Sequence, residues 1–361
     1  MCHSLGPLLR RATVGGLALA VMWVPGGVPA AAPGAPLAPE ANSLTFAQRY
    51  HAHQHGGIVR AANASITCRA AASCREVQAG GNGVNGDFDM FYIDVDNDPN
   101  TYNASSAEVR LPAGSRVTYA RLYWGGNLRV GEQKPPADNE RVLMAEPGGD
   151  YKQLLADTVV GHHVADGAEA FQASTDVTQL VRDSAPGLYT VSQVNVASGK
   201  SAAGAWGGWT LVVAYENPSE PLRDLAIWDG FAPLRSGGAQ EMRLRDLSFP
   251  AGAGGYAGLV AYNGDRGTTG DSLTLTTGQD AIDLSDSANP ADDVLNSTIS
   301  GPDGYRPARV PAYDNNLGYD SDVFDLGRGL QHAGDQATLR VTSQRDAAWV
   351  GVLFAAVDAQ R

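Results

Sequence analysis

The stretch DVDNDPNTYN combines three Asp with three Asn and follows an apolar run, MFYI. Asp94, Asp96 and Asp98 occupy the first, third and fifth positions of a calcium-binding EF-hand loop. That pattern also requires Gly at position six and Glu at position twelve, where this chain has Pro99 and Ser105. The stretch is therefore not an EF-hand.

Two interpretations of this stretch remain open. In an extended loop the three carboxylates lie on one side of the chain, and Asn100 could complete a looser calcium site. Alternatively, the stretch is an Asx-rich turn, in which Asp and Asn side chains hydrogen-bond to their own backbone. We favour the turn, and calcium is the cofactor that the sequence suggests if any is bound.

Acidic and aromatic residues in later loops are the next candidates. Asp265 and Asp271 lie in GDRGTTGDS, and more carboxylates follow in DLSDSANPADD and NNLGYDSD. Glycoside hydrolysis requires two carboxylates at a defined separation, which a sequence does not give. Trp206 lies in a Gly/Ala-rich loop, where we expect an exposed ring that could stack on a sugar. We therefore predict Trp206, Asp265 and Asp271 as ligand-binding residues and assign no catalytic residue.

The N-terminus has the features of a secretory signal. Residues 1–32 contain Arg10 and Arg11, a short apolar core, ATVGGLALAVMWV, and then small residues and prolines. A Pro/Ala-rich linker, residues 33–42, follows. The apolar core is too short to span a bilayer stably, and no second long apolar segment occurs in the sequence. We predict a secreted, extracellular protein with no stable membrane insertion after signal cleavage.

The charge of the chain limits its partners. Lys and Arg total 26, Asp and Glu total 39, and the formal net charge is −13. Nucleic-acid binding requires clustered cations, so this composition argues against a nucleic-acid partner. The partners that remain for an exported protein of this kind are an extracellular glycan or another protein.

Cysteine and histidine residues suggest one cross-link and one weak metal site. Cys68 and Cys74 are predicted to form a disulfide, because exported proteins mature in an oxidising compartment. Closing so small a loop stabilises a fold by roughly 2–3 kcal/mol. The segment HAHQH places His51, His53 and His55 at alternate positions, where copper or zinc could bind. It lies near the mature N-terminus, where we expect disorder.

The rest of the chain has a sequence pattern that predicts β-strands. Short alternating or apolar runs, such as GLYTVSQVNV, GWTLVVAYENP and WVGVLFAAV, are separated by Gly, Pro, Asn and Asp clusters. Residues 175–216 and 321–358 form a faint internal repeat, in which an Asp-Val opener leads to a strand, a Trp and an apolar strand. We predict an all-β fold of two antiparallel, jelly-roll-like β-sandwich lobes packed together, residues 43–218 and 219–361. One continuous sandwich with elaborate loops is the alternative.

Several blocks resemble a known family. FDMFYIDVDNDPNTYN, GGWTLVVAYENPSEPLRDLAIWDGF and YNGDRGTTGDSLTL, in this order and within residues 56–358, resemble a domain of unknown function. That uncharacterised β-domain stands at the N-terminus of large secreted bacterial surface proteins that carry tandem immunoglobulin-like wall repeats. The resemblance implies an extracellular, non-catalytic module of surface or matrix proteins. It supplies no catalytic residues.

Together these observations favour binding over catalysis. We predict a secreted β-sandwich protein with a binding or structural role at the cell surface or matrix, whose ligand is a glycan or a protein. The alternative, from a different class, is a secreted polysaccharide hydrolase that uses acidic loop residues. Binding is favoured because acid-rich loops are common on a chain this anionic, so such loops are weak evidence for hydrolysis. Nucleophilic catalysis has no obvious candidate either, because the sequence contains no GxSxG nucleophile elbow.

Overall fold

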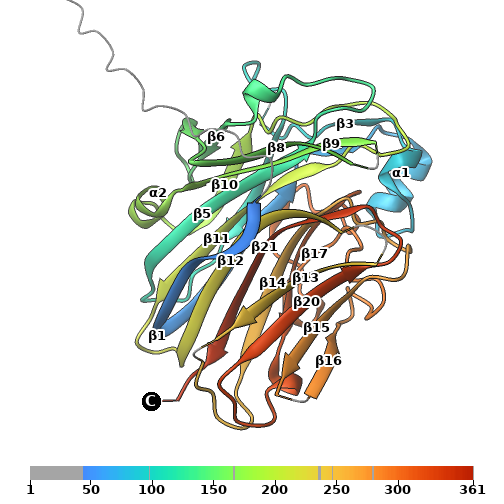
Figure 1. The fold of residues 1–361 in the computed structure, drawn as a ribbon. Helices are drawn as coiled ribbons and strands as arrows, with labels where there is room; N and C mark the ends of the chain where they lie inside the picture. Colours follow the sequence, from blue (N-terminus) through green and yellow to red (C-terminus); the bar gives the residue numbers. More distant parts are fainter. Residues whose placement is uncertain are drawn as a thin grey trace, which may run out of the picture. The chain divides into compact units, whose positions relative to one another are not determined.

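Two β-sandwiches make up the described part of the chain (Figure 1). A computed structural model describes residues 44–360 other than 97, 166, 235, 236, 246 and 279. The predicted signal, residues 1–32, and linker, residues 33–42, lie outside the described residues. The prediction of an all-β fold with two antiparallel lobes is confirmed.

The largest sheet has ten strands, and its strand order is β17-β19-β14-β21-β12-β1-β11-β5-β9-β8. Neighbouring strands are antiparallel, apart from the parallel pair β17–β19. The strands span β17 (Ile299–Ser300), β19 (Tyr319–Asp325), β14 (Gly255–Tyr262), β21 (Ala348–Asp358), β12 (Leu222–Leu234), β1 (Leu44–Ala64), β11 (Gly207–Glu216), β5 (Arg116–Asn127), β9 (Ala168–Asp176) and β8 (Thr158–Ala165).

Strand β1 joins the two halves of this sheet. Its residues 44–55 pair with β12, whereas its residues 56–64 pair with β11. The change of partner occurs at Gly56, which has a φ of 144°. A Cβ atom at this position would lie 2.0 Å from the carbonyl oxygen of Tyr215, so only glycine fits here. The HAHQH segment, for which we expected disorder, is part of strand β1. The Nδ1 atom of His53 lies 2.7 Å from a carboxylate oxygen of Asp224.

Two smaller sheets complete the sandwiches. A five-stranded sheet packs on the β11–β5–β9 half, and a four-stranded sheet packs on the β12–β21–β14 half. The five-stranded sheet contains, in order, β18 (Arg309–Val310), β4 (Ala104–Val109), β10 (Gly187–Ser192), β6 (Arg141–Ala145) and β7 (Lys152–Leu155). The four-stranded sheet contains β13 (Gly238–Leu244), β20 (Ala337–Ser343), β15 (Ser272–Thr277) and β16 (Asp280–Leu284).

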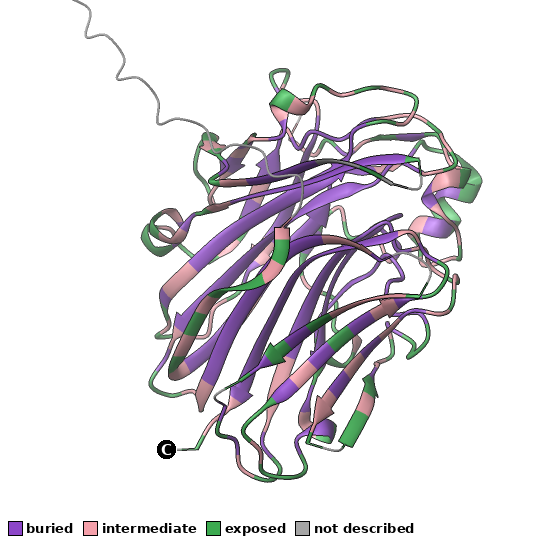
Figure 2. Ribbon diagram, in the orientation of Figure 1, coloured by how far each residue is buried: buried purple, intermediate pink, exposed green. Residues whose placement is uncertain are grey.

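Most of the ten-stranded sheet is buried on both faces, because its two halves also pack against each other, whereas residues 44–55 of β1 are exposed or half-buried (Figure 2). In β12, Ala226 and Trp228 belong to the core under the four-stranded sheet, while Leu225 and Ile227 belong to a central core between the halves. Side chains alternate between the faces of a strand, so consecutive apolar residues supply both cores. The Thr210 hydroxyl of β11 lies 2.7 Å from the Tyr319 hydroxyl of β19 across this interface.

The predicted boundary between residues 218 and 219 falls in the turn between β11 and β12. Two strand segments pair with the lobe other than the one to which the predicted boundary assigns them. The first half of β1 pairs with β12, and β18 pairs with β4. The described residues accordingly form one compact unit.

Helices are few and short in the part of the chain that the structure describes. The helices are α1 (Ala72–Gln78) and α2 (Thr178–Asp183), and the 3-10 turns are η1 (Asn85–Asp87), η2 (Pro136–Asp138), η3 (Pro302–Gly304) and η4 (Gly327–Gly329). None of these helices is long and apolar enough to cross a bilayer.

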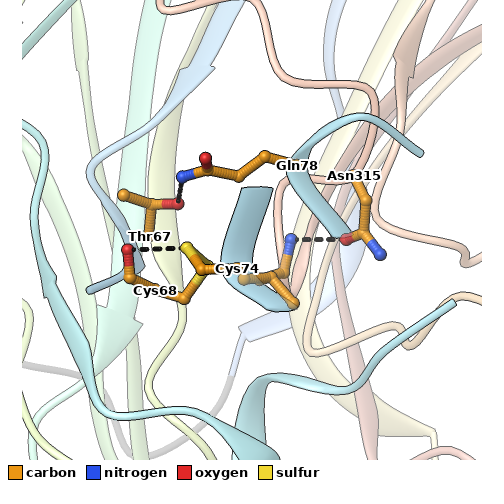
Figure 3. Close-up of a disulfide and its surroundings, with 6 residues drawn as sticks. Thr67, Cys68, Cys74, Gln78 and Asn315 are labelled. Atoms are coloured by element: carbon orange, nitrogen blue, oxygen red, sulfur yellow. Dashed lines mark hydrogen bonds between the residues drawn. A yellow bond between two sulfur atoms is a disulfide. The ribbon is translucent and has the colours of Figure 1, made fainter. Parts of the chain in front are cut away.

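The predicted disulfide between Cys68 and Cys74 is confirmed, and it attaches α1 to a small two-stranded sheet (Figure 3). That sheet pairs β2 (Ile66–Cys68) with β3 (Met90–Tyr92). Beside the disulfide, the amide of Gln78 donates a hydrogen bond to the Thr67 hydroxyl at 2.9 Å.

Candidate functional site

A groove of about 330 Å³ lies where the two lobes meet. Strands β1, β11, β14 and β19, the end of β4 and the 301–308 loop form its walls. We call it the tyrosine groove, after three of its lining residues. Its aromatic and charged lining consists of Arg60, Glu108, Arg110, Tyr215, Tyr256 and Tyr305.

The tyrosine rings differ in how they are held. The hydroxyl of Tyr256 donates to the Ile58 carbonyl at 3.0 Å and accepts from the Ile58 amide at 2.7 Å, which fixes its ring between β14 and β1. Burial raises the pKa of Tyr256 and of Tyr215, so both phenols remain neutral at physiological pH. Tyr305 is 54% exposed, an unusual exposure for a large aromatic side chain. The groove thus combines the hydrogen-bonded ring of Tyr256 and the ring of Tyr215, held by burial, with the accessible ring of Tyr305.

The 301–308 loop positions Tyr305. It is a tight turn, in which the Gly301 amide donates to the Tyr305 carbonyl at 2.6 Å and the Tyr305 amide donates to the Pro302 carbonyl at 3.2 Å. The ring packs against Gly301, where an added Cβ would lie 3.1 Å from a ring carbon. At the far end, Ala308 accepts a hydrogen bond from the Glu108 amide at 2.9 Å. The loop that carries Tyr305 is therefore attached to lobe 1 as well as lobe 2.

A second, smaller pocket of about 140 Å³ borders the same loop. Arg266, Arg306 and Arg309 line it, together with Asp314 and polar residues that include Ser300. We call it the arginine pocket. Arg306 pairs with Asp314 at 2.6 Å, and its side chain is 72% exposed.

Two buried guanidinium groups lie behind the pair of pockets. Arg60 lines the tyrosine groove and Arg309 lines the arginine pocket, and each is only 8% exposed. Among the described residues, both donate hydrogen bonds to backbone carbonyls alone, and both Nε atoms have no partner. Burial lowers the pKa of Arg60 to about 10, and burial together with the charge of Arg60 lowers the pKa of Arg309 to about 10, although the Asp322 carboxylate opposes both shifts. Two buried guanidinium groups thus lie here with Asp322 nearby but without a directly hydrogen-bonded carboxylate.

The acidic loops of lobe 2 do converge. Asp265, Asp271, Asp293 and Asp346 come together from separate loops with Asp320 of strand β19, and we call these five residues the aspartate cluster. The Asp265 amide donates to the Asp346 carboxyl at 3.2 Å. The backbones of Asp271 and Asp293 form an isolated parallel β-bridge. Burial, to which neighbouring carboxyls add, raises the pKa of Asp265 to about 7 and of Asp346 to about 8.

Burial determines what this cluster can do. Asp271 has no exposed surface, and one of its oxygens accepts the Leu295 amide at 2.7 Å. Burial also raises the pKa of Asp271 to about 7, which favours the neutral acid inside the fold. In this conformation Asp271 links its own loop to the segment at Leu295. Ligand binding by Asp265 and Asp271 stays a prediction.

Trp206 is fully buried, so the expectation of an exposed ring was wrong. Its ring lies 5.9 Å from that of Tyr262 in the central core. The glycines around it permit close packing: a Cβ at Gly204 would lie 1.2 Å from the Asn85 side-chain oxygen. The Gly/Ala-rich sequence that suggested a flexible loop instead lets backbone segments approach each other.

The DVDNDPNTYN stretch forms hydrogen bonds within its own turn. Asp96 accepts the Asp98 amide at 3.0 Å and also the Tyr151 hydroxyl, while Asp98 accepts the Asn100 amide at 2.9 Å. Within the described ranges, no three His, Cys, Asp or Glu residues are grouped to hold a metal ion. These bonds are those of an Asx turn. Calcium binding by Asp94, Asp96, Asp98 and Asn100 stays a prediction, and Asp96 would have to exchange hydrogen bonds for the ion.

Sequence reasoning did not identify the residues of the two pockets. Tyr305, Arg306 and Arg309 occur in GPDGYRPARV, where only the turn residues stand out. The available signal was an aromatic residue directly beside arginine in a loop of an acidic chain. Tyr215 and Tyr256 lie in strands, and only the packing of the lobes brings them to one groove.

No family model and no curated protein sequence matches this chain. Among solved structures, the chain is similar to the major capsid protein P2 of bacteriophage PM2, with 10% identity over 84% of this chain and 98% of that one, at a TM-score of 0.21. It is also similar to a β-porphyranase of glycoside hydrolase family 86 from the human gut bacterium Bacteroides plebeius, with 8% identity over 81% of this chain and 42% of that one, at a TM-score of 0.25. For recombinant N-glycanase F (PNGase F) the identity is 10% over 84% and 96%, at a TM-score of 0.22. Likenesses of this size support no inference about this chain.

Proposed function

We propose that this protein is an extracellular glycan-binding protein and that the tyrosine groove is its binding site. The observation that carries the proposal is the exposed ring of Tyr305 beside the fixed rings of Tyr215 and Tyr256. Aromatic rings offer a flat apolar face to the C–H groups of a sugar, and the nearby polar groups orient its hydroxyls. Glu108 and Arg110 supply such polar groups in the groove.

The size of the groove favours a glycan over a protein ligand. Its volume of about 330 Å³ lies at the lower end of the range for small-molecule pockets. Protein partners usually bind over larger and flatter surfaces. A few sugar units fit a groove of this kind, with the rest of a polysaccharide outside it.

Binding is favoured over hydrolysis by the carboxylates near the groove. Among the described residues that line it, Glu108 is the carboxylate present, whereas glycoside hydrolysis requires a pair. No member of the aspartate cluster is among the described residues that line the groove. The polysaccharide hydrolase remains the competing proposal, and release of reducing ends from a panel of polysaccharides would support it.

The proposal includes export and a role at the cell surface or matrix. The Cys68–Cys74 disulfide supports export, because such bonds persist in oxidising compartments. The resemblance to a domain of bacterial surface proteins points the same way.

A glycan array tests the proposal with three variants. We expect the protein to bind a subset of immobilised glycans and Tyr305→Ala to lower that binding about tenfold, a loss of about 1.4 kcal/mol. Tyr305→Phe keeps the ring and should retain most of the binding. Phe91→Ala is the matched control, because Phe91 is a 41% exposed aromatic residue outside the groove.

Two results would reject the tyrosine groove as a glycan site. The first is no binding to any glycan on an array that covers neutral, uronic and sulfated polysaccharides. The second is binding that Tyr305→Ala and Phe91→Ala leave equally unchanged.

A further inference from the structure

We infer that the glycan is acidic and that its carboxylate or sulfate group binds in the arginine pocket. This inference rests on the proposed function and adds the chemical class of the ligand. The carboxylate of a uronic acid and a sulfate ester share the chemistry that matters here: a compact anion with several acceptor oxygens.

The 301–308 loop borders both pockets. Tyr305 lines the tyrosine groove, and the next residue, Arg306, lines the arginine pocket. Tyr305 is 54% exposed and the Arg306 side chain is 72% exposed. A glycan chain that crosses this loop would therefore contact the ring of Tyr305 and the guanidinium group of Arg306.

Positive side chains outnumber negative ones in the lining of the arginine pocket. Three guanidinium groups line the arginine pocket, against the single carboxylate of Asp314 among its described lining residues. The whole chain has a net charge of −13, so this concentration of cations runs against its composition. Guanidinium groups bind carboxylate and sulfate oxygens through parallel hydrogen bonds, which suits them to such a pocket.

Buried charge lies behind the loop. Arg60 and Arg309 are buried, close enough to repel each other, and hydrogen-bonded to carbonyl groups alone within the described residues. Asp322 is a buried carboxyl near both, but burial raises its own pKa to about 7, so it balances their charge only in part, and incompletely balanced buried cations cost folding free energy. An anion in the arginine pocket would offset part of that cost, and the buried charges would in turn strengthen its binding.

The arginines of the pocket have different roles. Arg266 donates to the carbonyls of Gly80 at 3.1 Å and Asp314 at 3.2 Å, so it holds the pocket wall in place. Arg306 is exposed and pairs with Asp314. A ligand anion would take the place of the Asp314 carboxylate on Arg306, and Asp314 therefore competes with the ligand.

Isothermal titration with three oligosaccharides of equal length tests this inference: one neutral, one of uronic acids and one sulfated. We expect tighter binding of at least one acidic oligosaccharide than of the neutral one, and a difference that shrinks at high salt. Arg306→Ala should weaken the binding of that acidic oligosaccharide about fivefold to tenfold and leave the neutral one unchanged, since tenfold corresponds to one lost charged contact. Asp314→Asn should strengthen acidic binding, because it releases Arg306.

Controls separate this inference from the proposed function. Tyr305→Ala should weaken acidic and neutral oligosaccharides alike, and Arg243→Ala, which removes a 63% exposed arginine of β13, should change neither. Neutral binding that equals acidic binding, or an equal effect of Arg306→Ala on both, overturns the inference and leaves the proposed function standing. No binding of any of the three overturns both.

Discussion

Asp346 shows how burial changes the chemistry of a single carboxyl group. It is 4% exposed, and it accepts the Asp265 amide at 3.2 Å. Burial first, and the neighbouring carboxyls of Asp271 and Asp265 second, raise its pKa to about 8. An Asp in an unfolded chain has a pKa of about 3.9. Between these values the folded chain holds a proton that the unfolded chain releases.

We therefore expect the free energy of unfolding to fall as the pH rises from about 5 to about 8, the window below the raised pKa of Asp346. The sign follows from linkage: stability falls with pH wherever the folded state binds more protons than the unfolded state. Asp346→Asn keeps an oxygen that can accept the Asp265 amide but cannot titrate. Urea denaturation across this pH range should show a shallower fall for this variant than for the unmodified protein.

Asp335→Asn is the control for that pH series, because Asp335 is an exposed carboxyl of the same lobe. It should leave the slope unchanged. Equal slopes for Asp346→Asn and the unmodified protein would show that Asp346 is ionised inside the fold, contrary to our account.

At the scale of elements, the disulfide links helix α1 to strand β2. Cys68 ends β2 and Cys74 lies in α1, with a sequence separation of 6. Cross-linking so small a loop stabilises a fold by roughly 2 kcal/mol in the chain-entropy model. The double variant Cys68→Ala/Cys74→Ala should therefore lower the midpoint of urea denaturation without a change in slope. An unchanged midpoint would mean that the Gln78–Thr67 hydrogen bond and the packing of Val77 hold α1 by themselves.

Strand patterns were predictable from sequence because the apolar residues of β11 and of β12 alternate between two apolar cores in each strand. The change of partner within β1, from β12 to β11, could not be predicted from the sequence. It depends on the contact between Gly56 and Tyr215, which lie far apart in the chain. Burial of Trp206 was missed for a similar reason: its surroundings come from β14 and the segment before β19. Long-range packing of this kind leaves no periodic signal in the sequence.

For the candidate site, the sequence located acidic loops that do meet in space, yet it gave no sign that Asp271 is buried. It also could not bring Tyr215 beside Tyr305, because these residues come from different lobes and meet only when the two sandwiches pack together. Chemistry-bearing residue types are visible in a sequence. Their exposure is decided by tertiary structure.

At the scale of the whole molecule, the two lobes depend on each other. Residues 44–55 of β1 cover the edge of β12, and the central core takes side chains from both halves of the ten-stranded sheet. We expect the fragment 219–361 to fail to fold alone, because it would expose both that edge and half of the central core. Size-exclusion chromatography and thermal melting, with the chain from residue 43 as the control, measure this. A monomeric fragment with a sharp melt would contradict the shared core.

The most direct test of the central claim is a crystal structure of the protein soaked with an acidic oligosaccharide. We predict a sugar ring against Tyr305 in the tyrosine groove, with its carboxylate or sulfate oxygens contacting Arg306. A sugar bound elsewhere, for example in the separate pocket lined by Tyr102 and Arg141, with the tyrosine groove empty, would contradict the account.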